Sequence, residues 1–231
     1  MCQKSRGRFA ILKEMLIDNK LEIGALSFVI IIISVILHEL AHGYAAKRLG
    51  DDTAEAQGRL TFNPLAHVDP FMTVLLPLLL AISGQPVFGA AKPVPISRHK
   101  LKWDEFGMAI VGFAGPFTNL VLAAIGGAIL RGNFLTGSLW VTWWFYFIAI
   151  NIGFFVFNIL PIPPLDGSRV LYAFAPEFLQ EFMDKLERYG IFVILILVVL
   201  GYSFISPIIY SLDQHIMRLI SDKSIILNGL Y

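Results

Sequence analysis

Two histidines and a glutamate stand together in the stretch "ILHELAHGY" at residues 36–44. His38 and His42 are four positions apart, so on a helix both imidazoles project from one face and can bind the same metal ion. Glu39 is not needed as a ligand, and its place beside His38 suits a general base that takes a proton from water at the metal. The spacing therefore predicts metal-assisted hydrolysis. The alternative is a polar cluster that only holds neighbouring helices together.

A catalytic zinc site needs a third protein ligand and an open position for water. Asp166, in "NILPIPPLDGSRV", follows 34 residues without a charged side chain and is the best candidate. The three prolines within residues 161–164 cannot continue a helix, so the chain is expected to unwind there and turn Asp166 back toward the histidines. The alternative is that Asp166 only caps the N-terminus of the helix that follows.

Three further polar residues are candidates to support the site. Asn158 lies eight residues before Asp166, where its amide could donate to the oxyanion of a tetrahedral intermediate, an interaction worth about 3–4 kcal/mol. Its alternative is a hydrogen bond between helices, worth about 0.6–2 kcal/mol. His67, in "NPLAHVDP", and Asn119, in "AGPFTN", could contact the metal ligands from behind. The alternative for His67 is a hydrogen bond within its loop. The alternative for Asn119 is a hydrogen bond to a backbone group left unpaired by Pro116. Gly115 and Pro116 would also let a neighbouring helix approach closely.

The elements that carry these residues have the composition of a membrane protein. Hydrophobic residues make up 56% of the chain and charged residues 15%, whereas soluble domains carry about 25% charged residues. A spanning helix needs roughly 20 apolar residues. In such surroundings ionisable groups are costly and usually functional, which favours the metal site. Five runs contain no Asp, Glu, Lys or Arg: 23–38, 70–91, 106–130, 132–165 and 189–212.

We therefore predict an all-α polytopic membrane protein with about four to five spanning helices, a re-entrant or extended segment, and interfacial helices. The single cysteine excludes an internal disulfide framework, and the net charge of +1 gives no reason to expect a nucleic-acid partner. The spans are expected at 24–46, ending near Gly50, and at 104–131, 139–160 and 189–211. A short helix followed by extended chain is expected within 66–91, and interfacial structure over 166–187. The predicted regions are a basic amphipathic segment (1–22), a membrane-embedded domain (23–211) and a C-terminal tail (212–231).

The combined motifs resemble the site-2 protease family of intramembrane zinc metalloproteases. The resemblance runs from about residue 24 to 175 and rests on "HELAHGYAAKRLGD" and "NILPIPPLDGSR", with "GRLTFNPLAHVDP", "AKPVP" and "AGPFTN" between them. It implies one zinc ion held by His38, His42 and Asp166, with Glu39 as the catalytic base and Asn158 stabilising the substrate. It also implies a site within the membrane toward the cytoplasmic side, in a minimal form of the family without PDZ or CBS domains.

These observations predict a zinc metalloprotease that hydrolyses peptide bonds within or near transmembrane segments of substrate proteins. Its partners would be the lipid bilayer and a membrane protein with a transmembrane helix, and its location a prokaryotic cell membrane. The sequence indicates no oligomeric state. A broken, extended segment at 84–97 could pair with the substrate as an added strand. The alternatives are a metal-ion or proton transporter that uses the same His, Glu and Asp cluster, or an inactive scaffold that binds membrane helices.

Overall fold

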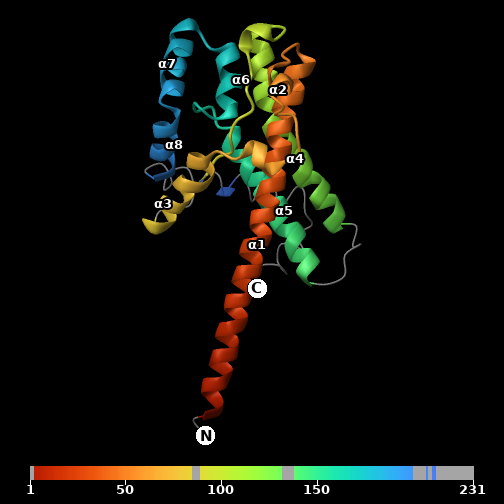
Figure 1. The fold of residues 1–231 in the computed structure, drawn as a ribbon, viewed down its shortest axis with the longest axis vertical. Coiled ribbons are helices and arrows are strands. Elements are labelled where there is room, and N and C mark those ends of the chain that lie inside the picture. The colour runs from red at the N-terminus through yellow and green to blue at the C-terminus, as the bar shows by residue number, and fades with distance from the viewer. Residues whose placement is uncertain (1–2, 85–88, 132–137, 200–206, 208–209, 212–231) are drawn as a thin grey trace.

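The computed structural model describes residues 3–84, 89–131, 138–199, 207 and 210–211. Over these residues the chain consists of helices and loops without a β-strand, in agreement with the predicted all-α class. Figure 1 shows the helices gathered in a bundle from which the first half of α1 extends alone. The elements are α1 (Gln3–Arg48), α2 (Thr53–Ala56), the 3-10 turn η1 (Pro64–His67), the short π-helix η2 (Pro70–Leu75), α3 (Leu76–Ile82), the 3-10 turn η3 (Arg98–Lys100), α4 (Asp104–Arg131), α5 (Ser138–Asn158), α6 (Asp166–Phe174), α7 (Glu177–Arg188) and α8 (Gly190–Val199).

Helix α4 is the centre of the bundle and packs against α1, α5 and α6. Its small residues let neighbouring helices approach closely: a Cβ added to Gly126 would lie only 2.8 Å from Ile148 Cγ1 on α5. Interdigitation of this kind gives membrane helices their packing energy, since lipid is as apolar as their side chains. The core between α4 and α5 consists of Ala123, Leu130, Ile148, Ile152 and Val156.

Two helices are long and apolar enough to cross a bilayer, judged by length and composition: Glu22–Arg48 and Asp104–Leu130. Two shorter apolar helices, Pro70–Leu80 and Trp143–Asn158, accompany them. The described chain thus has the helices of a membrane protein, although these two spans are fewer than the predicted four to five. Most of the second half of the predicted span at 189–211 and the predicted tail at 212–231 lie outside the described residues.

Helix α1 is continuous from residue 3 to residue 48, without a break between the predicted amphipathic segment 1–22 and the span that follows. Forty-six residues of helix extend roughly 69 Å, more than the ~40–45 Å of a bilayer with its headgroups. The position of residues 1–22 on the membrane surface stays a prediction. The helix ends where expected, because Gly50 takes a φ of 106° and Asp51 N–H donates to the carbonyl of Ala46 over 3.0 Å.

The segment predicted to combine a short helix with extended chain does so. The short helices η2 and α3 expose apolar side chains, among them Val74, Leu78 and Ile82, and an extended segment over residues 89–97 follows. This extended segment is tied to the chain before it, since the N–H of Ala90 donates to the carbonyl of Met72 over 3.1 Å. Such irregular backbone is tolerated at membrane depth where protein groups satisfy it.

The predicted interfacial stretch 166–187 is two helices, α6 and α7. Pro176 separates them, because a proline disfavours helical backbone at the residue before it, and Ala175 accordingly has φ −77° and ψ 143°. The break turns α7 away from α6, and α7 is amphipathic: Phe178 and Phe182 are exposed on it while Met183 is buried. The interface prediction therefore applies to two short helices.

Asp51 connects the end of α1 to the extended segment. Its carboxylate is fully buried and accepts hydrogen bonds from Thr53 N–H over 3.0 Å and Ser97 N–H over 2.5 Å. Burial by itself would raise the pKa of Asp51, but the hydrogen bonds from Thr53 and Ser97 outweigh it and hold that pKa below its usual range. The ionised form is thus the one that the folded chain stabilises.

We expect D51N to lower the free energy of unfolding by about 1.5–3 kcal/mol at pH 7, since hydrogen bonds to a buried charge are lost. Chemical denaturation in detergent measures it. Because the folded pKa is lowered, the advantage of the wild type is present above the unfolded pKa of about 3.9 and disappears as the pH falls through the folded pKa. The control is D52N, whose exposed carboxylate bonds Lys100 Nζ over 2.7 Å. Equal destabilisation by both variants would contradict the anchoring role.

Candidate metal centre

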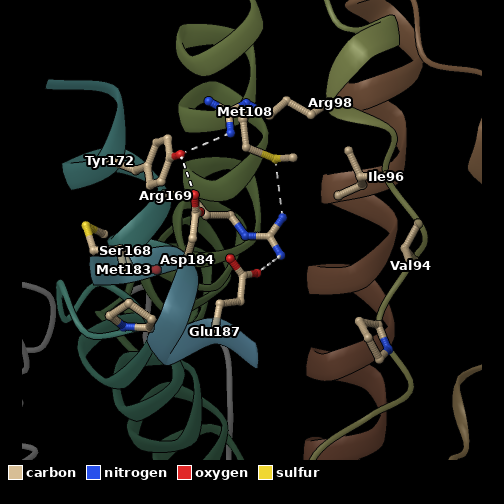
Figure 2. Close-up of a pocket in the computed structure, with 12 residues that line it drawn as sticks. Val94, Ile96, Arg98, Met108, Ser168, Arg169, Tyr172, Met183, Asp184 and Glu187 are labelled. Atoms are coloured by element: carbon tan, nitrogen blue, oxygen red, sulfur yellow. Dashed lines mark hydrogen bonds and ion pairs between the residues drawn. The ribbon is translucent and has the colours of Figure 1, made fainter. Parts of the chain in front are cut away.

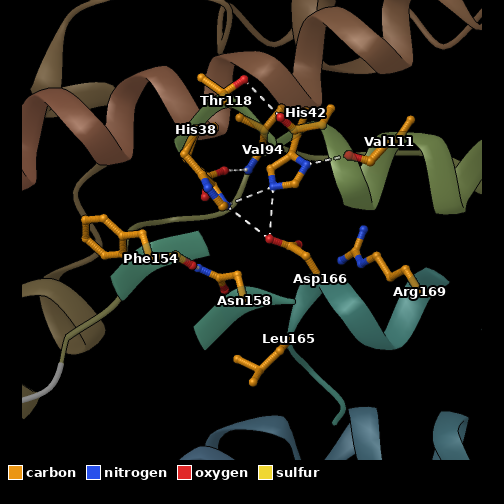
Figure 3. Close-up of polar contacts among 12 residues, drawn as sticks. His38, His42, Val94, Val111, Thr118, Phe154, Asn158, Leu165, Asp166 and Arg169 are labelled. Atoms are coloured by element: carbon orange, nitrogen blue, oxygen red, sulfur yellow. Dashed lines mark hydrogen bonds and ion pairs between the residues drawn. The ribbon is translucent and has the colours of Figure 1, made fainter. Parts of the chain in front are cut away.

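Three side chains from α1 and α6 converge at the middle of the bundle (Figure 3). The Nε2 atoms of His38 and His42 lie 3.0 Å apart, and Asp166 Oδ2 lies 3.1 Å from the first and 3.3 Å from the second. Both histidines are buried, with 8% and 6% of their surfaces exposed. One turn of α1 thus brings both imidazoles to one face, and the fold supplies the carboxylate opposite them.

Asp166 reaches the histidines because the chain folds back sharply after α5. A Cβ at Gly167 would overlap the carbonyl of Ile159, so only glycine fits this close approach. Asp166 is the first residue of α6, and the cap position belongs to Leu165, which makes no side-chain cap bond. The carboxylate of Asp166 therefore points at His38 and His42 instead of capping its own helix, contrary to the alternative considered above.

His38, His42 and Asp166 bring three electron-pair donor atoms together, two imidazole nitrogens and one carboxylate oxygen. His42 Nδ1 donates to the carbonyl of Val111 over 2.7 Å, and His38 Nδ1 faces the side-chain oxygen of Asn119 at 2.6 Å. Both imidazoles carry their hydrogen on Nδ1, which points away from Asp166. Both Nε2 atoms therefore keep a lone pair that faces the carboxylate. Ligands about 2.0–2.1 Å from a tetrahedral zinc stand roughly 3.3–3.5 Å from each other, close to the separations of this trio. The donor set and its spacing therefore fit a zinc ion.

Gly115 on α4 leaves the space that the imidazoles of His38 and His42 occupy. A Cβ at this position would overlap His42 Nε2 and come within 2.7 Å of His38 Nε2. The close approach that the sequence predicted at Gly115 and Pro116 is confirmed, and its reason is the pair of imidazole rings from α1. Any side chain here would displace a ligand.

Glu39 follows His38 on α1 and is held by the extended segment. Its Oε2 accepts a hydrogen bond from the N–H of Val94 over 2.8 Å. Val94 is itself buried, with its side chain packed near Gly43, where a Cβ would lie 3.2 Å from Val94 Cγ1. Within the described chain the second oxygen of Glu39 has no hydrogen-bond partner, so one oxygen is fixed and the other is available.

Asn119 contacts His38, the first of the two roles considered for it in the sequence analysis. Its side chain does not bond the backbone around Pro116: the oxygen faces His38, and Nδ2 donates to Asn151 Oδ1 over 2.9 Å. Asn151 is buried in the middle of α5 and carries no role in the sequence analysis. The signal for it was present, since it is an amide within an uncharged run of 34 residues.

Asn158 and His67 make local hydrogen bonds. Asn158 lies near Asp166 (Figure 3), and its Nδ2 donates to the carbonyl of Phe154 one turn earlier over 3.0 Å. His67 is buried in η1, where its Nε2 donates to the carbonyl of Thr61 over 2.9 Å. The structure thus gives His67 the loop hydrogen bond considered as its alternative. The bond between helices considered for Asn158 is instead a bond within α5.

A cavity of about 270 Å³ adjoins the site between the extended segment, α6 and α7 (Figure 2). Its apolar walls include Val94, whose N–H holds Glu39. Its polar rim centres on Tyr172, whose hydroxyl donates to Asp184 Oδ2 over 3.1 Å and accepts from Arg98 over 3.3 Å. Arg169, one turn beyond Asp166, also lines it. The cavity therefore reaches Val94, the residue that holds Glu39, but none of His38, His42 and Asp166 lines it.

Comparisons with known proteins agree with this geometry. The profile of the family described as Peptidase family M50 matches residues 26–201. The chain is 38% identical over 208 residues to "Putative zinc metalloprotease YwhC" of Bacillus subtilis, which covers 83% of this chain and 89% of that protein. It is 32% identical to "Putative zinc metalloprotease Rip2" of Mycolicibacterium smegmatis (73% of this chain, 64% of that protein) and 34% identical to "Putative zinc metalloprotease MJ0611" of Methanocaldococcus jannaschii (63% and 71%). No solved structure matches the chain significantly.

G115A should abolish stoichiometric zinc binding, because the added methyl group takes the space of both imidazole Nε2 atoms. Metal content of the purified protein in detergent, by mass spectrometry after zinc loading and desalting, measures this. G153A on α5 is the matched control, since a Cβ there meets nothing within 4 Å, and it should bind zinc like the wild type. Full zinc occupancy in G115A would show that the metal lies elsewhere.

Proposed function

This chain belongs to peptidase family M50, the site-2 protease family that its motifs resemble, and on that premise we propose that it cuts peptide bonds within or near transmembrane segments of other membrane proteins. It is a membrane zinc metalloprotease. The observation that carries the proposal is the convergence of His38, His42 and Asp166, with Glu39 beside them, among apolar helices. A hydrolytic centre so placed favours substrates that are themselves in the membrane.

In the proposed mechanism His38, His42 and Asp166 hold the zinc, and Glu39 moves the proton. A bound zinc supplies Lewis-acid activation of water and of the scissile carbonyl. The N–H of Val94 fixes one oxygen of Glu39, which leaves the other to take a proton from the attacking water. The water oxygen bonds to the carbonyl carbon, the C–N bond breaks, and Glu39 returns the proton to the leaving amine.

Asn158 is the proposed donor to the oxyanion. An amide nitrogen has two hydrogens, and one of them is used in the bond to the carbonyl of Phe154. That bond holds the side chain in one orientation near Asp166, and the second hydrogen is left for the substrate. A donor placed in advance costs no reorganisation when negative charge develops on the carbonyl oxygen.

The extended segment 89–97 is the proposed docking edge for the substrate backbone. Every second residue from 90 to 94 donates its N–H to the rest of the protein: Ala90, Lys92 and Val94. Such alternation is expected of an extended chain that has one edge facing the protein and the other facing away. Pro93 and Pro95 on the outer edge have no N–H, so Ala91 offers the outward donor in this stretch. A substrate strand added there would be unwound from its helix and laid beside Glu39.

We further propose that the protein crosses the membrane four to five times and lies in a prokaryotic cell membrane. Two long and two shorter apolar helices support the multi-pass arrangement. The relatives named above come from Bacillus, Mycolicibacterium and Methanocaldococcus, all prokaryotes. A transporter or an inactive scaffold gains no support, because the titratable groups meet at one three-ligand site with a base beside it.

E39Q should retain zinc but cleave substrates about 10²–10⁴-fold more slowly, because it removes the general base without touching a ligand. The measurement combines zinc content with mass spectrometry of fragments from a membrane proteome incubated with each variant. E55Q, which alters an exposed carboxylate paired with Lys47, is the control and should cleave normally. Unchanged cleavage by E39Q would exclude the mechanism. A transporter would keep zinc flux and a scaffold would keep helix binding in E39Q, and neither would yield fragments with the wild type.

A91P should raise the substrate concentration needed for half-maximal cleavage several-fold, because it removes an outward N–H of the docking edge and leaves the inward bonds in place. Cleavage of a model transmembrane substrate in detergent, over a range of concentrations, measures this. A91G retains the N–H and serves as the matched control, with zinc content checked in both variants. If A91P cleaves like A91G, the substrate does not pair with this edge.

A further inference from the structure

We infer that Asn151 is a positioning residue for the metal centre: acting through Asn119, it fixes His38 in the tautomer that can bind a metal ion. The inference rests on the proposed metal site and is independent of what the protein cleaves. It assigns a role to an amide in the middle of α5 that lies outside both metal-binding motifs of the sequence.

Three hydrogen bonds run from the metal centre through α4 to the backbone of α5. His38 Nδ1 lies 2.6 Å from Asn119 Oδ1, and Asn119 Nδ2 donates to Asn151 Oδ1 over 2.9 Å. Asn151 Nδ2 in turn donates to the carbonyl of Phe147 over 2.8 Å. Both asparagines are fully buried, so water does not compete for these bonds. The chain therefore couples a ligand on α1 to two other helices.

The direction of this chain is set at its far end. The carbonyl of Phe147 can only accept, so it must face the NH₂ of Asn151, which turns the oxygen of Asn151 toward Asn119. Asn119 must then present its own NH₂ to Asn151 and its oxygen to the imidazole. An oxygen at 2.6 Å requires the hydrogen on Nδ1 of His38, which leaves the lone pair on Nε2 at the metal centre.

His42 shows why a second amide is needed for His38. The Nδ1 of His42 meets the carbonyl of Val111 directly, and a carbonyl permits one tautomer only. An isolated amide gives no such guarantee, because its oxygen and its NH₂ have nearly the same shape and it can turn either end to the ring. Asn151 fixes the orientation of the Asn119 amide, so that its oxygen faces His38 as the carbonyl of Val111 faces His42.

Loss of an outer partner of a ligating histidine typically weakens metal affinity by about 10–100-fold. We therefore expect N151L to weaken zinc binding by about 10–100-fold, measured by competition with a chromophoric chelator on the full chain in detergent. T118V is the matched control: Thr118 Oγ1 donates to the carbonyl of Ala114 over 2.9 Å on the same helix as Asn119, without a bond to a ligand. It should bind zinc like the wild type.

A double-variant comparison separates orientation from packing. In N119D both side-chain oxygens can accept from His38, so the ligand no longer depends on which way residue 151 points. N151L should then have little effect: N119D/N151L should bind zinc at least several-fold more tightly than N151L alone. If N151L weakens zinc binding by the same factor in both backgrounds, Asn151 acts by packing and the inference is overturned. N151A, which removes the amide without adding bulk, provides a second variant should N151L not fold.

The tautomer itself can be observed without zinc or catalysis. The chain has five histidines, so ¹⁵N labelling of their rings gives a simple spectrum in which His38 is assigned by its absence from H38A. The metal-free wild type and T118V should show His38 protonated on Nδ1, whereas N151L or N151A should show a mixture of tautomers. The same single tautomer in all four proteins would overturn the inference. A wild type that binds no zinc would contradict the proposed function instead, and the tautomer measurement would still decide the role of Asn151.

Discussion

The Nε2 atoms of His38 and His42 and one oxygen of Asp166 lie within 3.3 Å of one another among apolar helices. Both imidazoles direct their N–H groups away from this point, so three electron pairs face each other where little solvent screens them. Such an arrangement is stable only with positive charge between the three atoms, and a divalent cation supplies it in the smallest space. Much of the surrounding structure places these three atoms where one cation can contact all of them.

Helix α4 makes the contacts that hold His38 and His42 of α1 in position. It contributes the gap at Gly115, which both imidazoles occupy, the carbonyl of Val111, which accepts from His42, and the amide oxygen of Asn119, which faces His38. The three contacts need three different properties of the same helix: a missing side chain, a backbone acceptor and a polar side chain. The position of α4 at the centre of the bundle follows from these contacts as well as from its apolar packing against α5.

The extended segment 89–97 holds Glu39, the proposed general base. Its attachments to the rest of the chain include Val94 N–H, which donates to Glu39, and Ser97 N–H, which donates to Asp51. The carbonyl of Lys92 accepts from Arg59 Nη2 over 2.7 Å. Alternating prolines leave its outer edge poor in donors, which keeps it from pairing with the wrong strand. A peptide that settles on this edge would meet a base whose orientation depends on the same backbone.

The sequence by itself determined what is local. A helical spacing of four places His38 and His42 on one face, Gly50 ends α1, and uninterrupted apolar runs predict an all-helical membrane protein with α4 at residues 104–131. Pro176, which separates α6 from α7 within 166–187, is an equally local signal.

Only the tertiary structure decided which partner each polar group takes. The pairing of Glu39 with the N–H of Val94, and of Asn119 with Asn151, joins residues 55 and 32 positions apart. Backbone N–H and carbonyl groups occur at nearly every residue and carry no sequence signal, and an amide can serve equally well as donor or acceptor. Which of them meets a ligand is set by how the helices pack, and that depends on the whole bundle at once.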